Sequence, residues 1–511
     1  MTESLKIPNP QRHPPKYAAW PAILAIIAAF IGAILFLHGR VPLGLNNDVA
    51  EEALRGIYLV KGGHLEVITF SIGNSAETLY LYLLGIVTSV FGATISSIQI
   101  ASGIAAVAVI LALWKLGERL RPAPPTWLLP LLSLCSIWLL HYTLSGLRAI
   151  AAPLFFALFA ISLDYAEEPQ SSIRSSLMCG AVLGLSVYAY SADRVLPIAF
   201  LIYAIVRLLA KPELRQRALR RYATIAASAF AASIPNIVFA ALHPREFFYR
   251  GSYVFLGNAS DRALNMLGTI FLPFFYPEFY RHIYGQAFHF DGVSAGLTVS
   301  GQNPIHIVYA AAIALGVWQM KHRLKEPLVL FTLLTWILTV LSIGTAGPSL
   351  TRMLILLPVY LILAALGFSW MANAQPRLRV PIFAVIVLVG VSDGYKYLSS
   401  AGKTPEYLLC CFNPAATAIG NSAAELAAQG RRVVAVLSRD ANVVNFLTSE
   451  YPDRTKTIEF SGRAIDPKQI PLDHGSVLLF ENNPTFNVFT AQLPRELLKV
   501  PNEFSYAVDV P

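Results

Sequence analysis

The first residues of the chain that could do chemistry follow its first apolar run. They read Leu45-Asn46-Asn47-Asp48-Val49-Ala50-Glu51-Glu52. A carboxylate that points into a cavity at a membrane surface can take the proton of an attacking hydroxyl. The structural alternative is a helix start, in which an asparagine caps the helix and the acids favour its dipole. Asp48, which comes first after the apolar run, is therefore a candidate general base.

Three arginines that come directly before later apolar runs could bind a phosphate. Arg148, Arg194 and Arg352 each stand beside such a run, and a guanidinium binds phosphate oxygens in a two-pronged fork. The alternative is that they anchor helix ends at the interface. Glu77 also begins an apolar stretch. It could contact a sugar hydroxyl, pair with an arginine of this set, or cap a helix.

Two further groups of residues are weaker candidates. Tyrosines near the same segments could line a sugar pocket, although interfacial tyrosines are common in membrane proteins; they are Tyr80, Tyr82, Tyr188 and Tyr190. A later polar segment could provide a metal or acceptor site, or have only a structural or gating role. Its candidates are Arg281, His282, His289 and Asp291.

The composition indicates a membrane protein. Hydrophobic residues make up 55% of the 511 residues, charged residues only 14%, and the net charge is +9, whereas soluble domains carry about 25% charged residues. The basic residues gather in short loops between apolar runs, which argues for a membrane partner and against nucleic acid. Four cysteines give neither a metal pattern nor a disulfide framework. The polar, Pro-rich start does not resemble a cleavable signal peptide.

Eleven apolar segments are predicted to span the bilayer, because a spanning helix needs about 20 mostly apolar residues. They are Tyr17–His38, Ile98–Leu116, Trp127–Tyr142, Ala149–Leu163, Leu177–Tyr190, Val195–Leu209, Tyr222–Leu242, Ile305–Met320, Leu328–Gly344, Met353–Ala372 and Val380–Tyr397. The densely basic loops fall on one side only if Thr78–Phe91 does not span. That segment is predicted to lie along or dip into the membrane, and the amino terminus is predicted to be cytoplasmic.

The predicted architecture is therefore an all-α polytopic membrane domain, residues 1–398, followed by a small α/β domain, residues 399–511. External loops cover 39–97 and 243–304. In the tail, Arg432–Leu437 and Ser476–Phe480 are predicted strands and Asn421–Gln429 is a predicted helix. The tail is expected on the extracytoplasmic side.

Several short motifs, in order, resemble the GT-C membrane glycosyltransferases, in particular bacterial relatives of the protein O-mannosyltransferase and aminoarabinose transferase group. The matching residues are Asp48, Gly62-Gly63, Ala76-Glu77-Thr78-Leu79-Tyr80-Leu81-Tyr82-Leu83 with Phe91-Gly92, Ser145-Gly146-Leu147-Arg148 with Pro153, Gly184 to Ser191 with Arg194 and Pro197, and Arg352 with Leu357-Pro358. The chain departs from the family pattern in having Val49 after Asp48, which leaves the second acid to Glu51. The acid of the next external turn is also missing from Thr143–Arg148, which puts metal-dependent chemistry in doubt.

The resemblance implies an enzyme of the bacterial inner membrane. It would transfer a monosaccharide from a polyprenyl-phosphate donor to a hydroxyl of an envelope lipid, polysaccharide or protein, without a cofactor. Asp48 would be the base, Arg148 and Arg194 would hold the phosphate, and Glu77 would contact the sugar or the arginines. Two rival hypotheses are a transporter or lipid flippase, which usually shows internal repeats that this chain lacks, and a non-catalytic subunit that binds partners through its tail.

Overall fold

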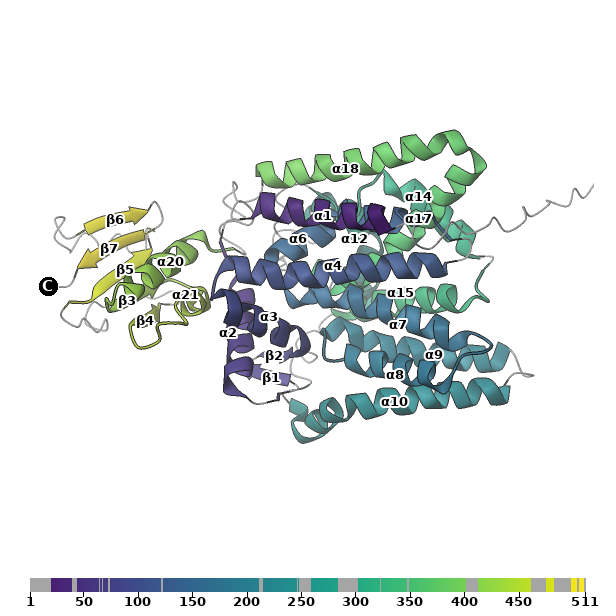
Figure 1. The fold of residues 1–511 in the computed structure, drawn as a ribbon, viewed down its shortest axis with the longest axis horizontal. Helices are drawn as coiled ribbons and strands as arrows, with labels where there is room; N and C mark the ends of the chain where they lie inside the picture. The colour runs from purple at the N-terminus through teal and green to yellow at the C-terminus, as the bar shows by residue number, and fades with distance from the viewer. Residues whose placement is uncertain are drawn as a thin grey trace, which may run out of the picture.

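The protein is a bundle of long helices with a smaller α/β unit at one end (Figure 1). The computed structural model describes residues 20–38, 44–63, 65–66, 68–71, 74–120, 123–210, 215–245, 247, 259–283, 302–321, 323–346, 349–400, 412–460, 475–481, 498–502 and 505–509. The α/β unit, whose elements run from residue 412 to residue 509, is called the tail domain below. The predicted fold class, an all-α membrane protein with a small α/β tail, is confirmed.

The helices follow the predicted apolar segments. They are α1 (Trp20–Leu37), α2 (Asn47–Gly62), α3 (Leu79–Phe91), α4 (Ile95–Arg119), α5 (Leu128–Leu134), α6 (Ile137–Ser145), η1 (Arg148–Ile150), α7 (Ala151–Glu167), α8 (Ile173–Ser186), η2 (Ser191–Arg194), α9 (Val195–Ala210), α10 (Arg215–Leu242), α12 (Ala259–Ile283), α14 (Tyr309–Lys321), α15 (Pro327–Ala346), α16 (Leu350–Met353), η5 (Leu354–Leu356), α17 (Leu357–Ala374), η6 (Pro376–Leu378) and α18 (Arg379–Ser400). Each of the eleven predicted spans contains at least one of these helices, although several are helical over only part of their length.

Six helical stretches within the described residues are long and apolar enough to cross a membrane by themselves. The pair α5 and α6, bent by 54°, makes a seventh if it counts as one span. Helix α17 forms the centre of the bundle, since every side chain from Leu357 to Ser369 is buried. The outer helices α1 and α18 instead expose large apolar side chains such as Leu35 and Val380, as expected for surfaces that face lipid rather than water.

The stretch 243–304, which was predicted as an external loop, includes a helix that was not predicted. It contains α12, which packs against α15 and buries Thr269 and Leu272. Its apolar run is interrupted by Pro273, and the backbone is non-helical at Phe275. Because prolines end or kink most helices, the sequence pattern favoured a loop there.

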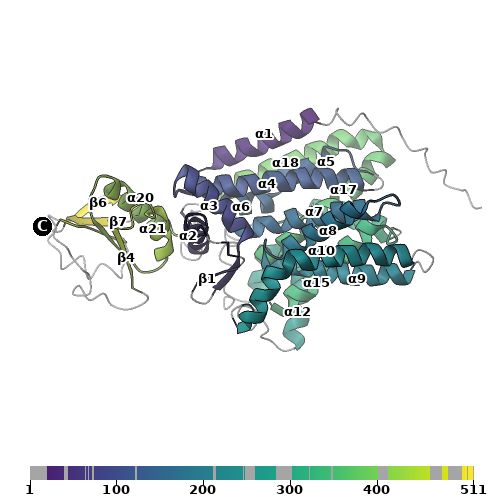
Figure 2. The same cartoon turned by 60° about the horizontal axis from the view of Figure 1, so that its bottom comes forward.

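The predicted basic loops meet at one end of the bundle. Arg119, at the end of α4, lies 3.1 Å from Asp164 of α7. Arg207 of α9 and Arg221 of α10 both pair with Glu167 at 3.2 Å, and Arg207 also donates a hydrogen bond to the Lys325 carbonyl. The other end of α4 lies beside the tail domain (Figures 1 and 2). The dense cations and the tail domain therefore occupy opposite ends.

Two short helices cross closely at the tail-domain end. A Cβ added to Gly56 of α2 would lie 2.5 Å from the Leu81 carbonyl oxygen, and one added to Gly85 of α3 would lie 2.0 Å from the Gly56 oxygen. Only glycines allow backbones to approach this closely. The antiparallel strands β1 (Ile68–Ser71) and β2 (Asn74–Glu77) connect the two helices. Leu79–Phe91 is a helix, as predicted, and it packs on α2.

The tail domain has a mixed sheet in the order β4-β3-β5-β7-β6. Its elements are α20 (Pro414–Ala428), β3 (Val433–Leu437), α21 (Ala441–Leu447), β4 (Thr455–Glu459), β5 (Val477–Glu481), β6 (Leu498–Asn502) and β7 (Ser505–Asp509). β4, β3 and β5 are parallel, and β7 and β6 are antiparallel additions. β3 and β5 are buried, mostly apolar strands, which is why the sequence pattern predicted these two strands but not β4, β6 or β7.

Candidate functional site

The amino-terminal turn of α2 carries Asp48. Asn46 caps this turn, because its side-chain oxygen accepts hydrogen bonds from the backbone N–H groups of Asp48, at 2.8 Å, and of Val49, at 3.3 Å. Asp48 itself is exposed, whereas Val49 and Ala50 are buried. The positive end of the helix dipole stabilises a carboxylate at this position. The Asn46 cap therefore fixes the position of the accessible Asp48 carboxylate.

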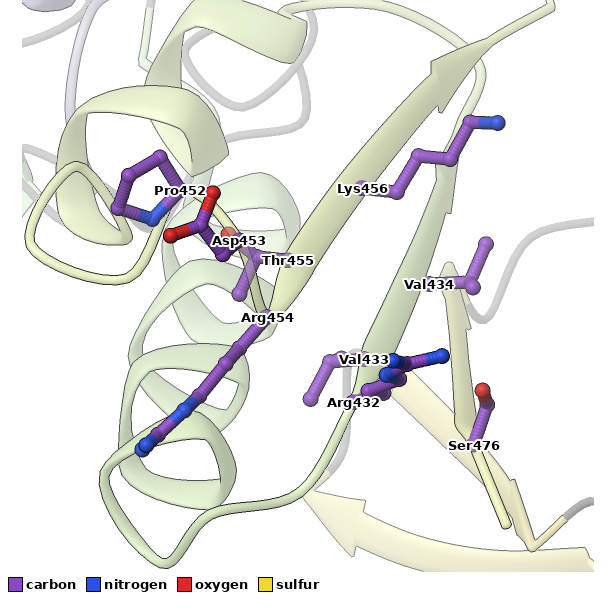
Figure 3. A pocket seen from close by; sticks show the side chains of 9 residues that line it. All are labelled: Arg432, Val433, Val434, Pro452, Asp453, Arg454, Thr455, Lys456 and Ser476. Atoms are coloured by element: carbon purple, nitrogen blue, oxygen red, sulfur yellow. The ribbon is translucent and has the colours of Figure 1, made fainter. Parts of the chain in front are cut away.

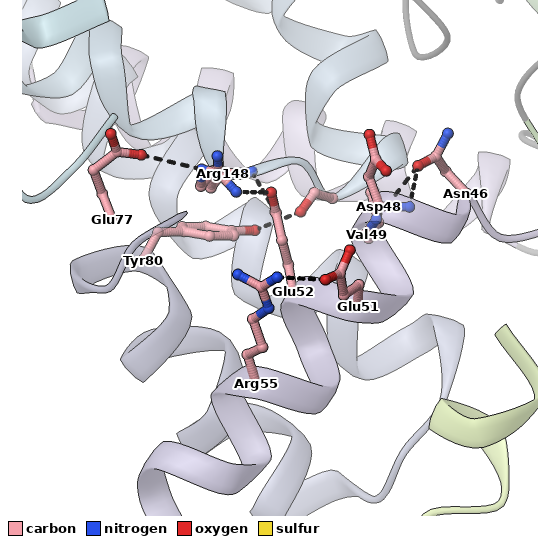
Figure 4. Close-up of polar contacts among 10 residues, drawn as sticks. Asn46, Asp48, Val49, Glu51, Glu52, Arg55, Glu77, Tyr80 and Arg148 are labelled. Atoms are coloured by element: carbon pink, nitrogen blue, oxygen red, sulfur yellow. Dashed lines mark hydrogen bonds and ion pairs between the residues drawn. The ribbon is translucent and has the colours of Figure 1, made fainter. Parts of the chain in front are cut away.

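Glu52 lies one helical turn after Asp48, on the same face of α2. It is buried and forms an ion pair with Arg148 of η1, which is also buried. Its second oxygen accepts a hydrogen bond from the Arg148 backbone N–H at 3.3 Å. Figure 4 shows the Asp48 and Glu52 side chains extending in the same direction from successive turns of α2, and Asp48 is close enough for its charge to act on Arg148.

Glu77, at the end of β2, joins Arg148 to Arg194. One of its oxygens lies 3.0 Å from Nη2 of Arg194 and the other 3.5 Å from Nε of Arg148. Glu77 is buried, while the side chain of Arg194 is 34% exposed. The charges therefore alternate along Glu52, Arg148, Glu77 and Arg194. Such alternation compensates most of the cost of burying them, and the chain of charges ends in an accessible cation.

The turn before Arg148 requires a glycine. Gly146 has φ +81°, and an added Cβ would lie 2.1 Å from Cγ2 of Ile98. Its carbonyl accepts a hydrogen bond from the buried Tyr80 hydroxyl at 3.0 Å. Tyr80 thus ties α3 to the turn that delivers Arg148. This gives Tyr80 a structural contact where the sequence suggested a sugar-binding one.

Asp193 of η2 is a buried carboxyl next to this network. It is fully buried, and neither of its oxygens has a hydrogen-bond partner among the described residues. Burial, together with the nearby Glu77 carboxylate, raises the pKa of Asp193 well above its usual range. Asp193 therefore holds a proton in the folded protein at pH values where an exposed aspartate has lost it.

This shift predicts how stability depends on pH. Because the pKa of Asp193 is raised by folding, its contribution to stability is complete below about pH 4 and is lost as the pH rises through the raised value. Asp193→Asn, which keeps the shape of the neutral acid, should therefore gain Tm relative to the wild type as the pH is raised. Thermal unfolding of both proteins from about pH 4 to about pH 8 measures this difference. A difference that stays flat over that range contradicts the assignment.

The other predicted residues lie outside the ion-pair network of Glu52, Arg148, Glu77 and Arg194. Glu51 pairs with Arg55 along α2 instead of facing Arg148. The Tyr82 hydroxyl bonds to the backbone of Glu66 at 2.8 and 3.1 Å, which holds the chain before β1. The Tyr190 ring lies 5.8 Å from the Arg148 guanidinium. Arg352 belongs to α16, which contacts η2, so its helix lies beside the one that carries Arg194.

The predicted residues of the second loop are not placed. Arg281 and His282 belong to the last turn of α12, for which only the backbone is described, and His289 and Asp291 lie outside the described residues. Within the described part of the chain, no three His, Cys, Asp or Glu side chains come together as metal ligands. The buried carboxylates Glu52 and Glu77 are already paired with arginines, so we derive no step through a metal.

Two residues of this site were missed by the sequence analysis. Glu52 could have been found from its spacing, because positions i and i+4 share one face of a helix, and Asp48 and Glu52 have that spacing. Asp193 supplies an acid in the turn η2, whereas the family pattern suggested an acid in the earlier turn Thr143–Arg148. Its position directly before Arg194 was the available signal.

A separate cavity of about 340 Å³ lies in the tail domain, at the amino ends of β3, β4 and β5 (Figure 3). Three cations line it: Arg432, Arg454 and Lys456. Nη1 of Arg454 donates a hydrogen bond to the Ala427 carbonyl at 2.8 Å, at the carboxyl end of α20, where cations stabilise a helix. Ligands of open α/β sheets bind at the opposite, carboxyl ends of the strands. We therefore assign Arg454 to the helix end.

Comparison with known proteins agrees with this geometry. Residues 78–239 match the family model of dolichyl-phosphate-mannose-protein mannosyltransferases. The fold is similar to ArnT from Cupriavidus metallidurans bound to undecaprenyl phosphate, with a TM-score of 0.59 and 11% identity over 96% of this chain and 98% of that one. No curated protein matches the chain significantly by sequence.

The fold is also similar to the archaeal oligosaccharyltransferase AglB from Archaeoglobus fulgidus, solved with an inhibitory peptide and a dolichol-phosphate. The TM-score is 0.53 at 12% identity, over 91% of this chain and 69% of that one. These matches confirm the resemblance predicted from the motifs, and the predicted class of membrane glycosyltransferases agrees with them. The chain is thus a polytopic membrane protein with the GT-C glycosyltransferase fold.

Proposed function

We propose that this protein transfers one monosaccharide from a polyprenyl-phosphate donor to a hydroxyl group of an envelope lipid, polysaccharide or protein. The donor class is suggested by undecaprenyl phosphate and dolichol-phosphate in the two similar structures. The observation that carries the proposal is the arrangement of charge. An accessible carboxylate, Asp48, stands beside a buried network that ends in a partly exposed cation, Arg194.

In the proposed reaction, Asp48 accepts the proton of the acceptor hydroxyl as its oxygen attacks the anomeric carbon of the sugar. The bond between that carbon and the phosphate oxygen breaks, and polyprenyl phosphate leaves with the bonding electrons. Arg194 stabilises the negative charge on the leaving phosphate. The Arg194 side chain pairs with Glu77 but is 34% exposed, so a phosphate can reach it, whereas Arg148 is buried and held by Glu52 and Glu77.

We further propose that the site faces the outer side of a bacterial inner membrane. Arg119 at the end of α4 and Arg207 of α9 lie at the end of the bundle away from the tail domain, together with Lys325 before α15. Because basic loops remain in the cytoplasm, that end is assigned to the cytoplasm together with the amino terminus. The tail domain and Asp48 are then extracytoplasmic.

The proposal is tested with purified protein in lipid vesicles and a polyprenyl-phosphate monosaccharide labelled in the sugar. The label should become covalently attached to an acceptor from envelope extracts, and mass spectrometry of the product should identify the sugar and its destination. Label that crosses the vesicle membrane without forming a covalent product would favour transport instead.

Arg194 provides a specific prediction for this assay. Arg194→Gln should lower kcat/KM for the donor by about 10- to 100-fold, because one charged hydrogen-bond donor to the phosphate is lost. Arg194→Lys keeps the charge but not the fork, so its loss should be intermediate. Steady-state kinetics with varied donor measures both.

Arg217 provides the matched control. It is an exposed arginine of α10 at the other end of the bundle. Arg217→Gln removes the same charge without touching the site, and it should leave kcat/KM near that of the wild type. Equal losses in Arg194→Gln and Arg217→Gln would indicate a general charge effect and contradict the phosphate-binding role of Arg194.

A further inference from the structure

The tail domain is joined to the segment just before Asp48 by buried backbone contacts. The backbone N–H of Leu45 donates a hydrogen bond to Oγ1 of Thr417 at 2.8 Å. The backbone N–H of Asn413 donates to the Leu45 carbonyl at 3.2 Å, which forms an isolated antiparallel bridge. All three residues are buried. Both polar backbone groups of Leu45 are therefore satisfied by the tail domain.

The two chain segments touch at the level of the backbone. Gly44 has φ +98°, and a Cβ added there would lie 2.6 Å from the backbone nitrogen of Pro414. No other residue allows this approach together with this backbone conformation. The contact is therefore made by the backbones of both segments, as in a pair of antiparallel β-strands.

The contact point also organises the tail domain itself. Oδ1 of Asn413 accepts a hydrogen bond from the Ala416 backbone N–H at 2.8 Å and caps α20. Nδ2 of the same side chain donates to Asp440 at 3.0 Å, directly before α21. The residue that pairs with Leu45 therefore fixes the starts of both tail helices.

Both helices of the first external segment reach the tail domain. α21 packs against α2. A Cβ added to Gly92, at the end of α3, would lie 3.3 Å from Oε1 of Glu450, so the tail domain also approaches that end. In both views α2 lies between the tail domain and the rest of the bundle (Figures 1 and 2).

We propose that the tail domain positions the catalytic carboxylate: by holding Leu45, it fixes Asn46 and with it the capped turn that carries Asp48. Asn46 follows Leu45 directly and its side chain determines how α2 begins. A displacement of a catalytic group by about 1 Å costs up to about a hundredfold in rate. This inference rests on the proposed function for its catalytic part.

The test compares two substitutions at Thr417. Thr417→Val keeps the shape but removes the acceptor for the Leu45 N–H, whereas Thr417→Ser keeps the hydroxyl. Thr448→Val is the control: Thr448 and Thr417 are both buried, and each hydroxyl donates to the carbonyl four residues earlier at 2.8 Å. The two threonines differ in that the Thr417 hydroxyl also accepts the hydrogen bond from the Leu45 backbone N–H.

Two measurements are made on the full-length protein in lipid. Amide hydrogen exchange of residues 45–49 should be faster in Thr417→Val than in Thr417→Ser, Thr448→Val and the wild type. Thr417→Val should also lower kcat by about tenfold with the donor KM unchanged, because the base moves while the phosphate site stays. Thr417→Ser should restore the rate.

The outcomes separate the inference from the proposed function. Unchanged exchange in Thr417→Val overturns the positioning role, as does faster exchange with an unchanged kcat. If the wild type transfers no sugar, the proposed function fails, and the exchange data still decide whether the tail domain holds the Asp48 turn. Equal effects of Thr417→Val and Thr448→Val would mean a general loosening of the tail domain and would also overturn it.

Discussion

Asp48→Asn is expected to lower kcat for sugar transfer by roughly 100- to 10,000-fold. An amide is nearly the same size as a carboxylate but does not accept the proton of the acceptor hydroxyl. The bond that caps α2 uses the backbone N–H of Asp48, which the substitution keeps, so the variant should fold. The affinity for the donor should change little, because the phosphate is bound through Arg194 in the proposed site. Single-turnover transfer and donor binding, measured on equal amounts of folded protein, check both expectations.

Glu51→Gln is the matched control for Asp48→Asn. Glu51 lies three residues after Asp48 in the same helix, but it pairs with Arg55 and is only partly exposed. Because such a pair contributes little, Glu51→Gln should change kcat by less than about threefold. If both substitutions abolish transfer to the same extent, or if Asp48→Asn remains active, Asp48 is not the base. In that case the favourable interaction with the helix dipole would remain as the role of Asp48.

The helical part of the fold could be predicted because bilayer-spanning segments have a strong local signal. An apolar run of sufficient length is visible in the sequence whatever surrounds it, and each of the eleven predicted runs contains helix. α12 was missed because Pro273 interrupts its run and the helix is completed by packing against α15. The strands β4, β6 and β7 of the tail domain were missed because they lack the continuous apolar pattern of β3 and β5.

The site could be predicted only in part. The motifs pointed to Asp48, Arg148 and Arg194, and the structure brings their elements together at one end of the bundle through Glu52 and Glu77. The sequence predicted that Arg148 binds the donor phosphate or anchors a helix end, whereas in the structure it is buried and paired with Glu52. Whether an arginine binds substrate or a buried acid depends on the rotation of α2 about its axis, and a motif does not specify that rotation.

The contact between the tail domain and the segment before Asp48 could not be predicted from local sequence patterns. Leu45 and Thr417 are separated by 372 positions, and nothing in either segment indicates the other. From the sequence, the tail could therefore be predicted only as a separate unit, without its contact to the segment before Asp48. The contact with Leu45 arises only when the bundle brings the ends of α1 and α18 to the same side (Figure 1).

Glu52→Gln should be the most destabilising single substitution among the carboxylates of the site. It leaves the buried guanidinium of Arg148 facing the carboxylate of Glu77, which is 3.5 Å away. Breaking a buried ion pair from one side costs about 3–5 kcal/mol, because a charge stays buried without compensation. The Tm of the purified protein should fall clearly. Glu118→Gln, which breaks the partly exposed pair with Lys115 at 3.1 Å, should cost no more than about 1 kcal/mol.

The double substitution Glu52→Leu with Arg148→Met distinguishes charge from shape. It replaces both members of the pair by apolar side chains, which is often neutral or even stabilising for buried pairs. Glu77 keeps its partner Arg194 at 3.0 Å. If Tm recovers in the double variant, the loss in Glu52→Gln came from an uncompensated charge; if Tm stays low, the two side chains are needed for packing. A double variant that is stable but does not transfer sugar would mean that the protein retains this buried pair for the electrostatics of its site rather than for its stability.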